Sequence, residues 1–371
     1  MVNRERLSKE FCELVSIDAP TLGEREIADL LKVKLEELGF QVQEDNAGEL
    51  IGGNCGNLFA TLEGEIVGLP LLFSSHMDTV EPALNKRPIV HPDGRITSSG
   101  DTVLGADDVA GIVAILEAVR SLKEDGLPHR SLEVFFPVAE EIFSKGCAVF
   151  DRDLIKAKEA YILDLNGRIG RAAFRAPSIV TFEIHMEGLS SHAGFSPETG
   201  IHAILSMAKG IAKMEMGRTK DAMTVNIGKI QGGKAVNIVP CDCFVQGEVR
   251  GFNHEKVMDK IEEIREIFAK EAQDSGATLN FNVTVNCKAY EMNTNDMPAK
   301  RYLSACEQVG AKAEFVETYG GSDFNILAEK GMIGLVLSNA MNDVHSCKEY
   351  TSVADLVLST QIVTKIMQDN R

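Results

Sequence analysis

The stretch that most constrains the fold is a short apolar run at residues 71–75, which leads directly into His76-Met77-Asp78. Such a run, bounded by Pro70 and ending in two serines, is typical of a buried central strand. The chemistry of open α/β sheets is carried just beyond the carboxyl ends of these strands. His76 and Asp78 are two residues apart, so they point to the same side of an extended chain. A histidine oriented by a carboxylate suits a metal ligand, although a surface turn is the more common explanation for an isolated pair of this kind.

Helical and strand patterns alternate along the first half of the chain. Helical spacing of apolar residues predicts helices at 2–16, 24–38 and 108–123, and strand-like runs occur at 41–44, 57–62, 71–75, 132–138 and 160–163. Residues 81–106 are rich in Pro and Gly and predict a long ordered loop. This alternation indicates a mixed α/β domain with a mainly parallel sheet flanked by helices.

The pattern changes near residue 176. Strands are predicted at 179–186, 223–230, 242–250 and 278–286, with helices at 198–214 and 254–273, which is the β-α-β-β-α-β order of a ferredoxin-like sandwich. Helices at 295–308, 323–330 and 352–368 and strands at 312–316 and 333–337 then resume the first pattern. We therefore expect an α/β domain at 1–175 plus 290–371, interrupted by an inserted α+β domain at 176–289. A sheet covered on one side has a free face or edge, which favours dimerisation through the insert.

Composition narrows the classes of function. The length of 371 residues favours more than one domain, and the net charge of −17 argues against nucleic acid as a partner. No apolar run approaches the ~18 residues of a membrane span, and the charged N-terminus lacks the features of a signal peptide. The eight cysteines form no C-x-x-C pair, which argues against a zinc knuckle or a thioredoxin-type site. Scattered thiols of this kind are expected to be reduced in a cytoplasmic protein.

Further acidic and imidazole side chains follow the other predicted strands or begin a helix. Each has an ordinary explanation when taken alone, such as a helix N-cap or a solvated pair. Together they supply two imidazoles and at least four carboxylates, a suitable set for two zinc-like cations. Two such ions about 3.5–4 Å apart can share a water and lower its pKa. Adjacent glutamates allow one to bind metal while the other serves as general base. The residues are His76, Asp107, Asp108, Glu140, Glu141, Asp164 and His345.

These motifs resemble those of the M20 family of di-zinc metallopeptidases, and within it the peptidase T (tripeptide aminopeptidase) group. The resemblance covers nearly the whole chain. It rests on His76-Met77-Asp78-Thr79, on the Gly-Ala-Asp-Asp-Val-Ala-Gly of residues 105–111, on Ala139-Glu140-Glu141, and on Asp164 and His345. In the insert it rests on Ser191-His192-Ala193-Gly194 and on residues 236–240, and later on Gly320-Gly321-Ser322-Asp323.

The resemblance implies two zinc ions per subunit, with cobalt or manganese as alternatives. Asp107 would bridge the ions, His76 and Asp164 would complete one site, and Glu141 and His345 the other. Asp78 would orient His76, and Glu140 would be the general base. The peptide bond between Asp107 and Asp108 would be cis.

The resemblance also implies a substrate site that involves the insert. In a homodimer, His192 would reach the partner's active site and stabilise the oxyanion. The remaining substrate-binding residues would be Asn237, Arg250, Gly321 and Ser322, although Ser322 suits the N-cap of the following helix equally well.

Two departures leave the substrate open. Residues 142–146 read Ile-Phe-Ser-Lys-Gly where many relatives have a Val-Gly-x-x-Gly turn, and the chain is shorter than expected for a peptidase T. The leading interpretation is a di-zinc exopeptidase of peptidase-T type that hydrolyses short peptides. A metal-dependent amidase or deacylase of N-acyl amino acids would use the same metals. A non-catalytic scaffold is the third alternative, and Glu140 argues against it because a scaffold needs no unligated base.

Overall fold

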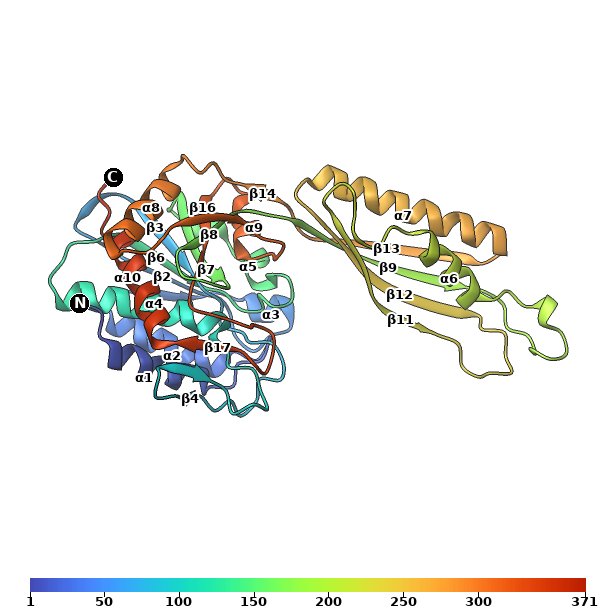
Figure 1. Cartoon of the computed structure of the whole chain (residues 1–371), viewed down its shortest axis with the longest axis horizontal. Helices are drawn as coiled ribbons and strands as arrows, with labels where there is room; N and C mark the ends of the chain where they lie inside the picture. The colour runs from blue at the N-terminus through green and yellow to red at the C-terminus, as the bar shows by residue number, and fades with distance from the viewer. The chain divides into compact units, whose positions relative to one another are not determined.

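The computed structural model describes all 371 residues (Figure 1). The chain divides into two compact units. The first unit comprises Met1–Arg175, Glu291–Glu317 and Ser322–Arg371, and the second comprises Ala176–Tyr290 and Thr318–Gly321.

A nine-stranded mixed sheet forms the centre of the first unit. Its path is β1-β2-β6-β3-β7-β16-β8-β14, with β15 beside β8. The four central strands, β6, β3, β7 and β16, are parallel to one another. On either side, β2 pairs antiparallel with β6 and β1, and β8 pairs antiparallel with β16 and parallel with β15. Parallel central strands bring their carboxyl ends to one edge, where ligands bind in such sheets. The strands are β1 (Gln41–Glu44), β2 (Leu58–Leu62), β3 (Ile66–Ser74), β6 (Arg130–Phe136), β7 (Glu159–Leu165), β8 (Arg171–Ala176), β14 (Tyr290–Glu291), β15 (Glu314–Glu317) and β16 (Ile333–Ser338).

Both faces of the central strands are buried. Phe73, Val134 and Tyr161 belong to the main apolar core together with residues from the five long helices. The alternate residues Leu72 and Phe135 are also fully buried. Burial on both faces explains why these strands are apolar at almost every position. The long helices are α1 (Arg4–Val15), α2 (Arg25–Glu37), α4 (Ala106–Glu124), α8 (Met297–Val309) and α10 (Val353–Met367), and the short ones are α3 (Ala47–Ile51), α5 (Lys145–Val149) and α9 (Asp323–Ala328).

The second unit is a ferredoxin-like sandwich, as predicted. Its antiparallel sheet has the order β10-β11-β12-β9-β13. Helices α6 and α7 pack on one face through a core that includes Phe182, Val245 and Phe268, while Thr181 and Glu183 on the other face are partly exposed. The elements are β9 (Ser178–Glu187), α6 (Ala203–Lys213), β10 (Gly217–Arg218), β11 (Thr224–Gly232), β12 (Asp242–Gly251), α7 (His254–Ser275) and β13 (Thr278–Cys287).

The structure corrects the predicted elements at several places. Residues 81–106 are not only loop, because β4 (Ile89–Val90) and β5 (Arg95–Thr97) pair there and β17 (Tyr350–Ser352) joins β5. The first helix of the insert begins at Ala203 rather than 198, because the His202 side chain accepts a hydrogen bond from the Leu205 amide and so caps the helix. Short elements such as α3 and α5 were missed because five residues show no period.

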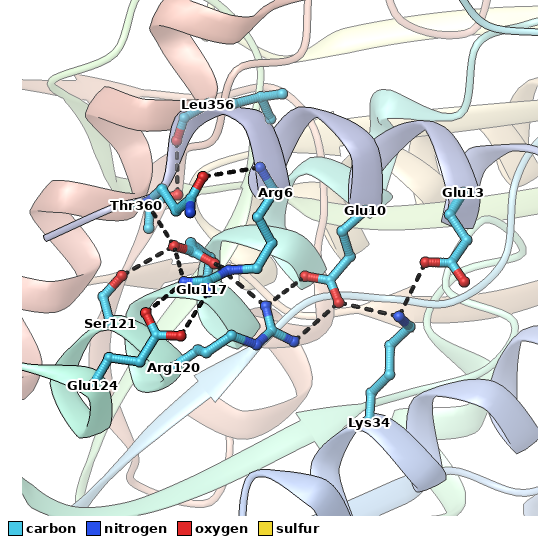
Figure 2. A network of polar contacts seen from close by, with 11 residues as sticks. Arg6, Glu10, Glu13, Lys34, Glu117, Arg120, Ser121, Glu124, Leu356 and Thr360 are labelled. Atoms are coloured by element: carbon cyan, nitrogen blue, oxygen red, sulfur yellow. Dashed lines mark hydrogen bonds and ion pairs between the residues drawn. The ribbon is translucent and has the colours of Figure 1, made fainter.

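A buried ion-pair network joins α1, α2 and α4 (Figure 2). The fully buried Glu117 accepts hydrogen bonds from Arg6 Nε at 2.7 Å, Ser121 Oγ at 3.0 Å and the Asn3 amide at 2.7 Å. Arg120 pairs with Glu10 at 2.9 Å, and Lys34 reaches the same carboxylate at 3.1 Å. The N-terminal helix is thereby tied to the helix that begins at the candidate site.

Replacing Glu117 should therefore be costly. Glu117→Ala leaves Arg6 without its buried partner and leaves Arg120 with Glu10 alone, and we expect the free energy of unfolding in urea to fall by about 3 kcal/mol. Glu124→Ala is the matched control, since Glu124 also pairs with Arg6 but its side chain is 51% exposed. That variant should lose less than about 1 kcal/mol. Equal losses in the two variants would contradict the assignment of the effect to burial.

Candidate metal centre

The carboxyl edge of the central sheet gathers the predicted ligands. His76 follows β3, and Glu141 follows β6. Asp164 is the penultimate residue of β7, and Asp107 lies at the start of α4. His345 follows β16 along the chain. All belong to the first unit.

Asp107 lies between the two histidines. Its Oδ1 is 3.1 Å from His76 Nε2, and its Oδ2 is 3.2 Å from His345 Nε2. His345 Nε2 is also 3.1 Å from Glu141 Oε2. Ligand atoms of His76, Asp107 and Glu141 lie within 4.8 Å of one another, as do those of His76, Glu140 and Asp164. The structure therefore brings together every predicted ligand and the predicted base.

Asp78 contacts both the His76 side chain and the backbone of Glu140 and Glu141. Its Oδ1 is 3.3 Å from His76 Nδ1 and accepts the Glu140 amide at 2.9 Å. Its Oδ2 accepts the Glu141 amide at 3.2 Å and Thr21 Oγ1 at 2.9 Å. One buried carboxylate thus fixes the orientation of the imidazole and the backbone of the two glutamates.

The segment that carries Asp107 is held by groups that sequence reasoning missed. The carboxylate of Glu349 accepts the amides of Leu104, Gly105 and Asp107 at 2.7, 2.8 and 2.9 Å. The Asp107–Asp108 peptide bond is cis, as the resemblance implied. Asp108 accepts hydrogen bonds from Ser75 Oγ at 2.7 Å and from the Asn339 side chain. Glu349 and Asn339 belong to no motif in the sequence, because each of their partners lies at least 176 residues away along the chain.

Strained backbone is concentrated in the same region. Nine non-glycine residues have positive φ, and six of them lie in the segments that follow β6 and β16. Such conformations cost about 1–3 kcal/mol each and persist where the surroundings determine them. The six are Ala139, Phe143, Ser144, Ala340, Asp343 and His345.

The electrostatics show a shortage of positive charge. Burial raises the pKa of Glu140 and of Asp164 well above the usual range. Hydrogen bonds to Asp107 and Glu141 raise the pKa of His345 to about 10. Burial opposes ionisation of Asp107, but hydrogen bonds from the two histidines hold its pKa well below the usual value. In addition, Glu141 Oε1 is buried without a partner. Two divalent cations would supply the missing charge and the missing partner, so the donor set fits such a pair.

The predicted substrate residues are divided between the units. His192, Asn237, Arg250 and Gly321 lie in the second unit, and Ser322 lies in the first. Asn237 O accepts the Ala193 amide at 3.0 Å, next to His192. Arg250 pairs with Glu248 at 2.9 Å and donates to Tyr319 O at 2.9 Å.

Ser322 proves to be the N-cap of α9. It forms a capping box with Asn325, whose side chain accepts the Ser322 amide at 3.1 Å. Ser322 therefore has the N-cap role that the sequence also suggested for it.

None of the helices combines the length and the hydropathy that a membrane span requires.

Comparison with known proteins identifies the family. Residues 72–369 match the model described as Peptidase family M20/M25/M40. A Bacillus subtilis (strain 168) protein described as the uncharacterized protein YqjE is 34% identical over 369 residues, which cover 100% of this chain and 99% of that protein.

Two solved structures agree with this match. The aminopeptidase PepT from Bacillus cereus ATCC 10987 has a TM-score of 0.91 and 35% identity, covering 99% of this chain and 98% of its own. A tripeptidase from Staphylococcus aureus has a TM-score of 0.96 and 32% identity with the same coverage. The fold class predicted from sequence, an α/β domain with an inserted α+β domain, is confirmed. The chain belongs to peptidase family M20/M25/M40.

The position of Asp107 gives a direct test. Asp107→Ala should lower the metal content of both sites together, because one carboxylate faces both histidines. Elemental analysis of the purified protein measures this, with Asp164→Ala as the control that should lose one ion. Loss of a single ion from Asp107→Ala would assign that residue to one site only.

Proposed function

We propose that the protein is a cytoplasmic two-metal exopeptidase, an aminopeptidase of peptidase-T type that removes residues from short peptides. The observation that carries the proposal is the carboxylate of Asp107, with one oxygen toward each histidine and Glu140 close by. The aminopeptidase and the tripeptidase among the similar structures support the substrate class. The eight free cysteines support a reducing compartment.

The residues fit two zinc ions, with cobalt or manganese as alternatives. His76 and Asp164 would hold one ion, Glu141 and His345 the other, and Asp107 both. When bound, the ions polarise the scissile carbonyl and lower the pKa of the attacking water. Asp78 fixes the ring of His76, which keeps Nε2 directed at Asp107.

Glu140 suits the role of general base. Its burial raises the pKa of its carboxyl group, which favours uptake of a proton from the attacking water. The same carboxyl then returns that proton to the leaving amine. The Asp78 carboxylate holds the Glu140 amide, and Ser144 Oγ donates to Glu140 Oε1 at 3.3 Å. These contacts orient the base without neutralising it.

We further propose that the insert at residues 176–289, which makes up most of the second unit, serves as lid and dimerisation domain. His192 Nδ1 accepts the amides of Gly194 and Phe195 at 3.1 and 3.2 Å. The ring proton is therefore on Nε2, which makes no hydrogen bond in the chain and suits an oxyanion. Phe195 and Val236 are 86% and 103% exposed, which supports a contact with a second copy near this histidine.

Substrate binding is assigned to Asn237, Arg250, Gly321 and Ser322. A guanidinium can bind a peptide carboxylate in bidentate fashion, and Arg250 already does so with Glu248. To bind the substrate carboxylate in this way, Arg250 would therefore have to release Glu248.

A hydrolysis panel tests the function. Metal-loaded protein should release the N-terminal residue of tripeptides, and should act poorly on N-acetylated tripeptides and on N-acyl amino acids. Cleavage of the acyl amino acids alone would establish a deacylase. No hydrolysis by protein that holds two ions would support the non-catalytic alternative.

Glu140→Gln tests the base. The variant should keep both ions, because the five ligands remain, while kcat falls by roughly 10²- to 10⁴-fold. Glu141→Gln is the control and should lose metal. Near-normal turnover would remove Glu140 from the mechanism, and loss of an ion from Glu140→Gln would make it a ligand.

Mixed dimers test whether His192 acts across subunits. Glu140→Gln and His192→Ala homodimers should each be nearly inactive, while subunit exchange creates one site with an intact base and an intact histidine. Part of the activity should return on mixing. Exchange without recovery, or a monomer at working concentration, would contradict action in trans.

A further inference from the structure

Three successive backbone amides at the candidate base are held by two buried carboxyl groups. Asp78 accepts the amides of Glu140 and Glu141, as described above. The amide before them, Ala139 N, donates to Glu24 Oε1 at 3.1 Å. Glu24 therefore continues the row of acceptors by one position, from a part of the chain that carries no metal ligand.

The Ala139 amide is the one in the row that needs support most. Ala139 has φ 55° and is fully buried at the turn between β6 and the glutamate pair. A left-handed conformation costs an alanine about 1 kcal/mol relative to glycine. Relaxation of this residue toward negative φ would rotate the Ala139–Glu140 peptide and carry the Glu140 side chain away from the metal ligands.

The side chain of Glu24 forms hydrogen bonds with backbone amides only. It is fully buried just before α2, and Oε1 also accepts the Leu22 amide at 2.9 Å, while Oε2 has no partner. Burial and the nearby Asp78 raise the pKa of Glu24 to about 7. A buried carboxyl group with an unsatisfied oxygen is unfavourable for stability. An unpaired buried polar group of this kind is retained where function needs it.

The segment around Glu24 is itself tied to the site. The Thr79 amide donates to Ala19 O at 2.9 Å, and Thr21 Oγ1 donates to Asp78 Oδ2 at 2.9 Å. The family model begins at residue 72, so this segment lies outside the matched region. The N-terminal segment nevertheless helps to hold the residues that follow β3 in place.

We propose that Glu24 is a positioning residue for Glu140, which holds Ala139 in its left-handed conformation and thereby directs the general base at the metal pair. The proposal deepens the proposed function and rests on the role of Glu140 in it. Glu24 acts through the backbone and touches neither substrate nor metal.

The test uses Glu24→Met, which removes the acceptor and keeps most of the volume. With a tripeptide substrate, kcat should fall by at least about tenfold, since small misplacements of catalytic groups have effects of this size. KM and the content of metal should stay within about twofold of the wild type. Glu24→Gln keeps a carbonyl acceptor and should retain kcat within about threefold.

A second substitution separates positioning from general damage. Ala139→Gly adopts positive φ without strain, so it should restore part of the kcat lost by Glu24→Met. Glu133→Met is the matched control, because Glu133 is an equally buried carboxylate that accepts two amides, Lys156 N at 2.9 Å and Ala157 N at 3.0 Å. It should keep kcat near the wild-type value.

Hydrogen exchange supplies a readout that does not depend on activity. Protection of the Ala139 and Glu140 amides should fall in Glu24→Met and recover in part with Ala139→Gly. Unchanged kcat and protection in Glu24→Met would overturn the proposal, as would an equal loss of kcat in Glu133→Met or no recovery with Ala139→Gly. If the wild type hydrolyses no peptide, the proposed function fails, and exchange at these two amides still decides the role of Glu24.

Discussion

The attraction between a cluster of buried and half-buried carboxylates and the positive charge placed among them is the interaction on which this structure depends. Asp107, Asp164, Glu140 and Glu141 lie at one edge of the sheet, and the structure offers them only two imidazoles. Buried carboxylates resist ionisation, and the raised pKa values of Glu140 and Asp164 express that resistance. The site therefore favours divalent cations on electrostatic grounds, before any coordination geometry is considered.

The rest of the first unit gives these side chains a rigid support. Asp164 lies in β7, while His76 and Glu141 follow the neighbouring parallel strands β3 and β6, so the order of the sheet brings the three together. Asp78 and Glu349 then bind five backbone amides near the ligands. The sheet sets where the ligand-bearing segments begin, and the strained segments after β6 and β16 carry two of the ligands, Glu141 and His345.

The strands and long helices could be predicted because the regular spacing of apolar residues is visible within each segment of the sequence. The candidate ligands could be predicted because packing alone does not account for a charged residue directly after an apolar run. Glu24, Glu349 and Asn339 could not be predicted in the same way. Their partners are main-chain groups that only the folded chain brings near, and a lone glutamate before a helix resembles an ordinary first-turn acid. The β4–β5 hairpin was missed because its strands are two or three residues long.

The order of the sheet has a consequence for how the protein is made. Strand β16 pairs with β7 near the middle of the nine strands, yet it follows the whole of the second unit in the chain. The ribosome therefore releases β9 to β13, which form a sheet of their own, before the strand that completes the first sheet exists. During this interval His76, Asp107, Glu141 and Asp164 are already synthesised, while His345 and Glu349 are not. The inserted unit can fold as a nascent chain, and the metal centre is assembled only from a finished one.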